Sequence, residues 1–257
     1  MGRIPVKKLS GFLCAFFLLP LTTPCVAGSL TIAVSANVQF AFQDLQAAFT
    51  RETGIGVQTI IGSSGKITAQ VRSGAPFDVF LSADMNYPQT LQKEGLANSA
   101  PIVYAYGTLV LWTMSDLDLT PGLKVLTDAK VSKVAIANPK LAPYGRAALQ
   151  ALTHYHIADA VQAKAVFGEN VSQVNQYVYS QNVTAGFTAK SVVLSPTMRG
   201  KGHWIEVPLD TYQPIAQGVV ILKHGADNAE ANCESFIRFL ATAPARKILA
   251  DYGYGLP

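Results

Sequence analysis

The chain has 257 residues, of which 49% are hydrophobic and 14% charged, and its formal net charge is +4. Arg3, Lys7 and Lys8 account for most of this excess, so the chain without its first 27 residues carries about +1 and gives no indication of a nucleic-acid partner. Two of the three cysteines, Cys14 and Cys25, also lie in this leader, which excludes an intramolecular disulfide in the remainder.

Residues 1–27 have the pattern of an export signal. Basic residues come first, followed by the apolar run 11–22, which is too short to span a bilayer, and by small residues at 26–28. We therefore expect a cleavable signal peptide and a periplasmic protein. A lipoprotein anchor at Cys25 is the alternative, although Thr-Thr-Pro precedes that cysteine instead of the small residues that such processing requires.

Strand and helix signals alternate along the remaining stretch, which predicts α/β architecture with mainly parallel sheets. Val38, Phe42, Leu45 and Phe49 recur at helical spacing, and this stripe ends before Gly54. In this first part we expect strands at 30–35, 56–61 and 77–82, and helices over 38–53, 66–72 and 88–94.

The apolar run 102–113 is unusually long for one strand, and Gly107 in its middle permits a bend, so we interpret it as a crossing into a second lobe. That lobe is expected to hold strands at 134–137, 165–167 and 185–189 and helices at 145–152 and 171–180. The run 215–222 is predicted to return to the first sheet. Asp227 with Glu230 indicates the start of a long helix to about 240, on which Cys233 is core filler, and a last helix covers 243–252.

Two crossings between two lobes describe a hinged cleft. We expect lobe I to consist of residues 28–105 and 195–257, and lobe II of residues 106–194. Each lobe is expected to be a mainly parallel sheet flanked by helices, with two strands forming the hinge.

Four predicted helix starts directly follow strands, where the free N–H groups and the positive end of the helix dipole favour an anion. They are Asn37, Ser63-Ser64, Pro143-Tyr144-Gly145 and Glu169-Asn170-Val171-Ser172. Ligands of parallel α/β sheets bind at such turns. Gly145 is expected to let a ligand approach the backbone. The alternative is that each turn is an ordinary helix cap, since Ser, Asn and Pro are common there.

The segment 74–84, Gly-Ala-Pro-Phe-Asp-Val-Phe-Leu-Ser-Ala-Asp, closely resembles the Gly-Ala-Pro-x-Asp-[Val/Leu]-Phe-x-Ser-Ala-Asp segment of the periplasmic molybdate-binding proteins of ABC importers. The resemblance extends to the Gly-Ser-Ser turn, to 138–145, to the Glu-Asn-Val turn and to the Tyr-Gly-Tyr-Gly-Leu-Pro ending at 252–257. It implies a type II, two-lobed periplasmic binding protein that is not an enzyme. Such a protein closes on molybdate or tungstate and passes the ion to a membrane permease.

The resemblance also implies a ligand set for the oxyanion. Carried over position by position, the family's contacts fall on Ala36, Asn37, Ser64, Tyr144 and Val171. Molybdenum would be bound only as the oxyanion, through the last four of these residues, with no cofactor, and the protein is expected to be a monomer. Some members add a tyrosine hydroxyl where this chain has Ala189.

Two alternatives to molybdate transport remain open. One is a binding protein for another tetrahedral oxyanion such as sulfate or phosphate, and the other is a secreted α/β hydrolase that uses Ser64 as nucleophile, although no paired base stands at a telling spacing. Lys66 and Arg146 lie one or two residues past the ligand turns. As residues of a first helical turn they are expected to attract the anion at long range instead of touching it.

Overall fold

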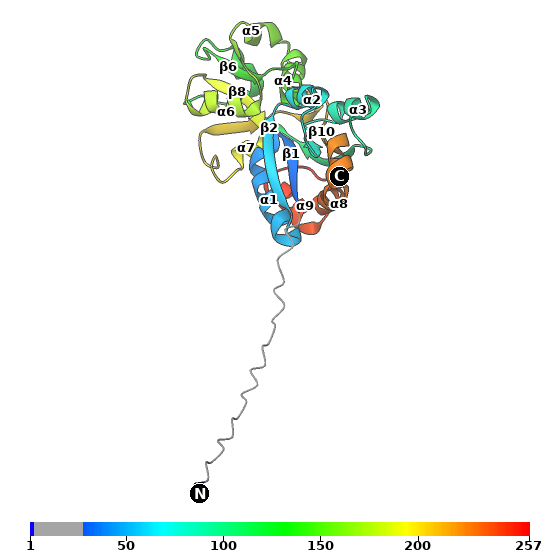
Figure 1. The fold of residues 1–257 in the computed structure, drawn as a ribbon. Coiled ribbons are helices and arrows are strands. Elements are labelled where there is room, and N and C mark those ends of the chain that lie inside the picture. The colour runs from blue at the N-terminus through cyan, green and yellow to red at the C-terminus, as the bar shows by residue number, and fades with distance from the viewer. Residues whose placement is uncertain (3–27) are drawn as a thin grey trace.

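The computed structural model describes residues 1–2 and 28–257, so residues 3–27 of the expected export signal lie outside the described part of the chain. The described chain folds into two lobes, one above the other in Figure 1, and each is built on a five-stranded sheet. No helix among the described residues has both the length and the apolar character needed to cross a membrane.

The sheet of lobe I has the strand order β2-β1-β3-β10-β4. Its strands are β1 (Ser29–Ser35), β2 (Gly56–Gly62), β3 (Val79–Leu81), β4 (Ile102–Gly107) and β10 (Ile215–Ile221). β1 is parallel to both β2 and β3, whereas β10 is antiparallel to β3 and to β4. β10 is therefore the strand that runs against the other four.

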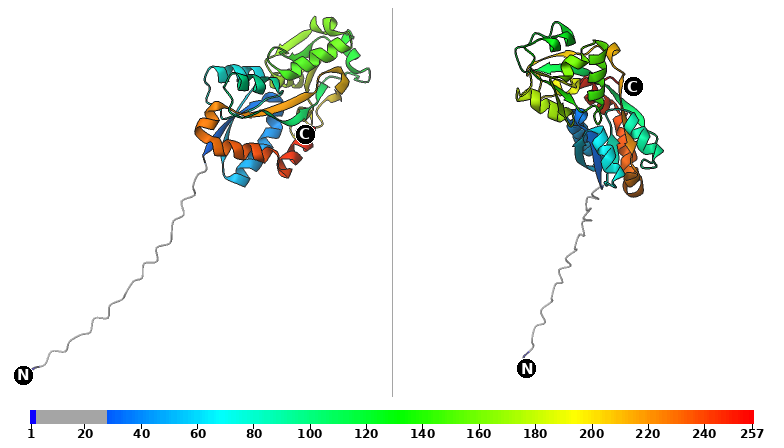
Figure 2. Two further views of the ribbon diagram at one scale, coloured as in Figure 1. Left: turned by 90° about the vertical axis from the view of Figure 1, so that its right-hand side faces the viewer. Right: turned by 90° about the horizontal axis from the view of Figure 1, so that it is seen from above.

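Helices cover both faces of this sheet, as the left view of Figure 2 shows. They are α1 (Gln39–Thr53), α2 (Ser64–Arg72), α3 (Asn86–Lys93), α8 (Lys223–Leu240) and α9 (Ala243–Asp251). The alternation of β1 explains the two cores: Leu30, Ile32 and Val34 pack under α1, α8 and α9, while Ala33 faces the cluster under α2 and α3. Cys233 is fully buried in the first of these cores, as predicted.

Lobe II repeats this plan with the strand order β7-β6-β8-β5-β9. Its strands are β5 (Leu109–Thr113), β6 (Val134–Ala137), β7 (Ala165–Gly168), β8 (Ala185–Ala189) and β9 (His203–Glu206). Its α-helices are α4 (Pro143–His154), α5 (Ala158–Gln162), α6 (Val171–Tyr179) and α7 (Lys190–Val193), and a 3-10 turn covers Gly122–Thr127. Two further 3-10 turns lie at Ala36–Val38, after β1 of lobe I, and at Leu209–Thr211, between β9 and β10. β6 is parallel to β7 and β8, and β5 is antiparallel to β8 and β9, so β5 is the reversed strand here.

The chain crosses between the lobes twice, and the first crossing falls within the predicted run 102–113, two residues past the expected boundary at residue 105. The apolar run 102–113 divides after Gly107 into β4 of lobe I and β5 of lobe II, and β10 brings the chain back to lobe I. The expected boundary at residue 195 is wrong, however, because β9 at 203–206 pairs with β5 in the second sheet. The return crossing lies between β9 and β10.

Two further expectations are corrected. The long helix α8 begins at Lys223, not at Asp227, and Ala229 is a non-helical kink within it (φ −148°). The residue at the cap position, Leu222, has no side chain that can accept a hydrogen bond, which is why the sequence pointed to Asp227 instead. The stretch 77–82 is a strand only over the three residues of β3.

Candidate functional site

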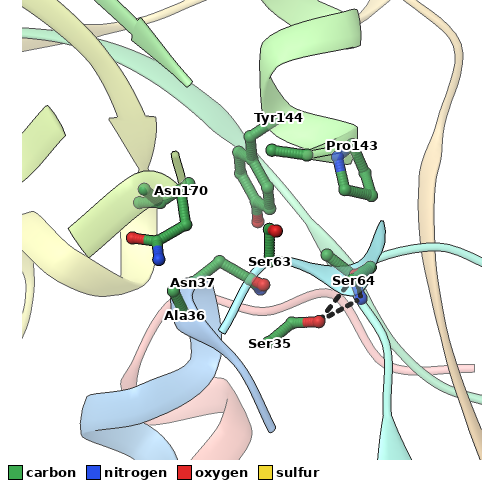
Figure 3. Close-up of a pocket in the computed structure, with 11 residues that line it drawn as sticks. Ser35, Ala36, Asn37, Ser63, Ser64, Pro143, Tyr144 and Asn170 are labelled. Carbon is green, nitrogen blue, oxygen red and sulfur yellow. Dashed lines mark hydrogen bonds between the residues drawn. The ribbon is translucent and has the colours of Figure 1, made fainter. Parts of the chain in front are cut away.

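A small pocket lies beyond the carboxyl ends of β1, β2 and β3 in lobe I and of β6 and β7 in lobe II. It is lined by residues of both lobes: Ser35, Ala36, Asn37, Ser63, Ser64, Ala83, Ala142, Pro143, Tyr144, Asn170 and Val171. Figure 3 shows these residues grouped around one point. The cavity volume is about 10 Å³, far below that of a site for a drug-sized organic ligand. None of the lining residues is charged.

The structure brings together all five residues to which the family resemblance assigned ligand contacts: Ala36, Asn37, Ser64, Tyr144 and Val171. The four helix starts predicted from the sequence therefore face one pocket, two from each lobe. The sequence reasoning did not single out Ser35, Ala83 or Ala142. Ser35 is the last residue of β1, two residues before the predicted helix start at Asn37. This position at the end of a strand could have identified Ser35 as a pocket residue.

Two of the helix starts are capped by their own side chains. Ser63 Oγ accepts from the Lys66 N–H at 3.3 Å, and Asn170 Oδ1 accepts from the Gln173 N–H at 3.1 Å. These two side chains thus have the ordinary capping role. The caps fix the helix starts, and the first N–H groups after them, at Ser64 and Val171, have no acceptor within their own helices.

The α4 helix start is built differently. Pro143 occupies its first turn, where the missing N–H costs nothing, and the N–H of Tyr144 is the next donor at the pocket. Gly145 does not have the role expected for it. A Cβ there would collide with the carbonyl oxygen of Ala137, so glycine is required because α4 packs directly on the end of β6.

Ser64 presents a hydroxyl whose surroundings fix its position. Ser64 Oγ and Ser35 Oγ are 2.6 Å apart, and the N–H of Ala83 donates to both, at 3.0 and 3.1 Å. If Ser35 donates to Ser64, the Ser64 proton is free to point into the pocket. Figure 3 shows these hydrogen bonds as dashed lines. A neutral, preorganised O–H donor results.

Asn37 is held from several sides. Its backbone carbonyl accepts from Ser191 Oγ at 2.8 Å and from the Tyr254 hydroxyl at 3.1 Å. Its side-chain Nδ2 donates to Gln217 Oε1 at 2.8 Å and to the Tyr254 hydroxyl at 3.4 Å. Asn37 is 2% exposed, and its Oδ1 has no hydrogen-bond partner among the described residues.

The lobes touch beside the pocket. The Gly65 N–H of α2 donates to the carbonyl of Leu141 in lobe II at 2.9 Å, and Ser172 Oγ of α6 donates to Gln39 Oε1 at 2.8 Å. Lys66 and Arg146 do not line the pocket. Instead, each forms an ion pair across the cleft, Lys66 with Glu169 at 3.0 Å and Arg146 with Asp84.

The chemistry offered to a guest is therefore neutral. Burial raises the pKa of the Tyr144 hydroxyl well above its ordinary value, so this lining side chain carries no charge. No cluster of three or more His, Cys, Asp or Glu side chains suited to a metal cation is found among residues 1–2 and 28–257. N–H and O–H donors without cations suit an anion that stays unprotonated. Ala189, at the end of β8, is fully buried and does not line the pocket.

Residues 30–255 match the family described as bacterial extracellular solute-binding proteins. The chain is 36% identical to the molybdate-binding protein ModA of Rhodobacter capsulatus over 99% of both chains. It is 37% identical to ModA of Azotobacter vinelandii over 90% of this chain and 91% of that protein. The solved structure of the Azotobacter vinelandii periplasmic molybdate-binding protein superposes with a TM-score of 0.84 at 33% identity, covering 89% of this chain and 99% of that one.

Proposed function

Because this chain belongs to the molybdate-binding ModA proteins within the bacterial extracellular solute-binding family, we propose that it captures molybdate between its lobes and delivers it to an ABC importer. Family membership also makes it a binding protein and not an enzyme, so the hydrolase alternative with Ser64 as nucleophile falls. We propose that residues 1–27 are a cleavable export signal and that the mature protein acts in the periplasm, where a permease can receive the ion.

One observation carries the proposal: four helix starts from two lobes converge on a small pocket that no charged side chain lines. A dianion that enters a closed cleft loses hydration worth on the order of tens of kcal/mol in the Born limit, so the protein must replace those hydrogen bonds. The proposed donors are Asn37, Ser64 and the backbone N–H groups of Tyr144 and Val171, with Ala36 beside them.

Size supports molybdate over sulfate or phosphate. A ring of donors held by two packed lobes cannot contract freely, so a smaller tetrahedral ion would leave some hydrogen bonds too long. Tungstate has the same shape and charge and the same need for donors. Protonated phosphate would also present an O–H to a site that offers donors, and that O–H would lack an acceptor.

Isothermal titration of the mature protein, residues 28–257, with molybdate, tungstate, sulfate and phosphate tests the proposal. We expect tight binding of molybdate and tungstate and no measurable heat with sulfate or phosphate at equal concentration. Tighter binding of sulfate would move the assignment to the other oxyanion class. Absence of heat with all four ions would refute an oxyanion site altogether.

A further inference from the structure

A network of hydrogen-bonded, buried polar side chains extends from the pocket into the hinge. Asn37 Nδ2 donates to Gln217 Oε1 at 2.8 Å, the Tyr104 hydroxyl donates to the same oxygen at 2.8 Å, and Gln217 Nε2 donates to the Tyr144 hydroxyl at 3.4 Å. All four residues are at least 95% buried, Gln217 completely. Gln217 lies in the middle of the apolar strand β10, at a register shift between Gln217 and Gly218. Such irregularities re-aim a side chain.

The orientation of the Asn37 amide conflicts with an anionic guest. With Nδ2 directed at Gln217 Oε1, the unpartnered Oδ1 is turned away from Gln217, and Asn37 lines the pocket. A carbonyl oxygen facing molybdate would repel it, since both are acceptors. Half a turn about χ2 would exchange the two atoms and present N–H instead. That turn alone would leave Oδ1 facing Gln217 Oε1, two acceptors in contact.

A simultaneous half turn of the Gln217 amide removes this conflict. Gln217 Nε2 then has two protons for two acceptors, Asn37 Oδ1 and the Tyr104 hydroxyl, while Gln217 Oε1 accepts from the Tyr144 hydroxyl. Each tyrosine hydroxyl can donate or accept, so the number of hydrogen bonds among these four side chains is kept. The Tyr254 hydroxyl, which accepts from Asn37 Nδ2 at 3.4 Å, would face Asn37 Oδ1 after the turn. The same turn removes the buried, unpartnered oxygen of Asn37, a feature that costs about 1–3 kcal/mol in proteins generally.

We call this coupled turn of the Asn37 and Gln217 amides the relay. The side chains and glycine around the two amides favour it. Burial raises the pKa of the Tyr104 and Tyr144 hydroxyls well above their ordinary values, so both keep the proton that the relay needs. Gly107, at the crossing between the lobes, leaves room for it, because a Cβ there would overlap the Tyr144 hydroxyl and lie 2.7 Å from Gln217 Nε2. Tyr144 reaches Gln217 from lobe II, so the relay is complete only when the lobes are closed.

We propose that Gln217 is a positioning residue that turns the Asn37 amide so that its N–H, and not its carbonyl oxygen, faces the bound oxyanion. This inference rests on the proposed function. It assigns part of the selectivity for an unprotonated anion to a residue of the hinge strand that does not line the pocket.

A double-mutant cycle on molybdate affinity, with Gln217→Met and Asn37→Ala in the mature protein, tests the inference. Met keeps the size of the side chain but offers no N–H. We expect Gln217→Met to weaken binding about 10- to 100-fold when Asn37 is present, the scale of one hydrogen bond to a charged group. In the Asn37→Ala background we expect a change below about threefold. A purely structural role of Gln217 would weaken binding equally in both backgrounds, and that result would overturn the inference.

A measurement on the unmutated protein adds a readout that does not depend on the molybdate affinity of the variants. In ¹⁵N–¹H spectra, assigned with Asn37→Ala and Gln217→Met, the side-chain NH₂ signals of both residues should shift when molybdate is added. A stationary Asn37 NH₂ signal in protein that binds molybdate would contradict the relay alone. Failure of the unmutated protein to bind molybdate or tungstate would instead overturn the proposed function, and the inference with it.

Discussion

The backbone N–H of Gly65 in lobe I donates to the carbonyl of Leu141 in lobe II at 2.9 Å. This hydrogen bond joins the start of α2 to the loop before α4, and both helix starts line the pocket. A Cβ on Gly65 would lie 3.0 Å from the Leu141 Cα and carbonyl oxygen and 2.8 Å from the Tyr87 hydroxyl. Closure of the lobes thus depends on a residue without a side chain.

Gly65→Ala is expected to separate closure from folding. Alanine favours a helix over glycine by about 1 kcal/mol, so the unfolding free energy of the ligand-free protein should stay equal or rise. Molybdate affinity should fall, because the closed lobes cannot accommodate the methyl group. Urea unfolding and isothermal titration measure the two effects. Adding Tyr87→Phe should restore part of the affinity, and unchanged affinity in Gly65→Ala would contradict the role assigned to this contact.

Ser64→Ala is expected to lower mainly the affinity for molybdate, and Ser63→Ala mainly the stability of the fold. Loss of the Ser64 hydroxyl should weaken molybdate binding by roughly 1–3 kcal/mol with little loss of stability, since Ser35 still accepts from Ala83. Loss of the Ser63 cap should cost about 1 kcal/mol of stability with a smaller effect on affinity. Titration and urea unfolding of both variants provide the comparison. If Ser64→Ala binds molybdate as tightly as the parent, the Ser64 hydroxyl is not a ligand contact and this turn serves only to start α2.

Arg146→Met is expected to weaken binding more than Asp84→Asn. Asp84 is largely buried at the cleft, and burial raises its pKa while Arg146 opposes that rise. Removing the arginine therefore leaves a buried carboxylate without its partner in the closed form, and we expect roughly a 10-fold loss of affinity. The double variant should resemble Asp84→Asn.

Lys66→Gln is the matched control for Arg146→Met. The Lys66–Glu169 pair also spans the cleft, but its side chains are about half exposed, so its loss should change affinity by less than about threefold. Equal losses in the two variants would show that general attraction of the anion, and not the buried pair, explains the effect of Arg146.

Stability is expected to fall at alkaline pH. Burial raises the pKa of Tyr254 from 10.0 to about 12, and it raises the pKa of Tyr104 and of Tyr144 well above the ordinary value. Between pH 10 and the pKa of the folded state, the folded protein therefore holds more protons than the unfolded chain, so the unfolding free energy decreases as pH rises. Below this range these hydroxyls contribute no pH dependence. Urea unfolding at intervals from pH 8 to 11 measures the slope, and a flat profile above pH 10 would contradict it.

Cys233 is expected to be unreactive in the native protein. Its side chain is fully buried between α8 and the lobe I sheet, and burial raises the pKa of its thiol to about 12. Because the thiolate is the reactive form, Ellman's reagent should label the mature protein, residues 28–257, only after denaturant is added. Rapid labelling of native protein would place this thiol at the surface.

The sequence by itself determined the main course of the chain. Apolar periodicity, glycines and prolines placed nearly all the strands and the helices around the pocket, and the division of 102–113 at Gly107 predicted the crossing between lobes. These signals succeed because they are local: a stripe of apolar residues or a capping serine acts within its own element. The start of α8, β9 and the short helices α5 and α7 were missed, because their sequences lack a cap or a clear period.

Only the tertiary structure decided which residues work together. Asn37, Ser64, Tyr144 and Val171 could be named from helix starts and a family resemblance, but their meeting at one pocket depends on the packing of two lobes. Gln217 reads as a lone polar residue in an apolar strand, and Gly145 as a ligand-access glycine. Gln217 contacts Asn37, which lies far away along the chain, and Gly145 packs against the Ala137 carbonyl of the preceding strand β6. Local patterns specify elements, whereas the partners of a buried polar group are set by the three-dimensional packing around it.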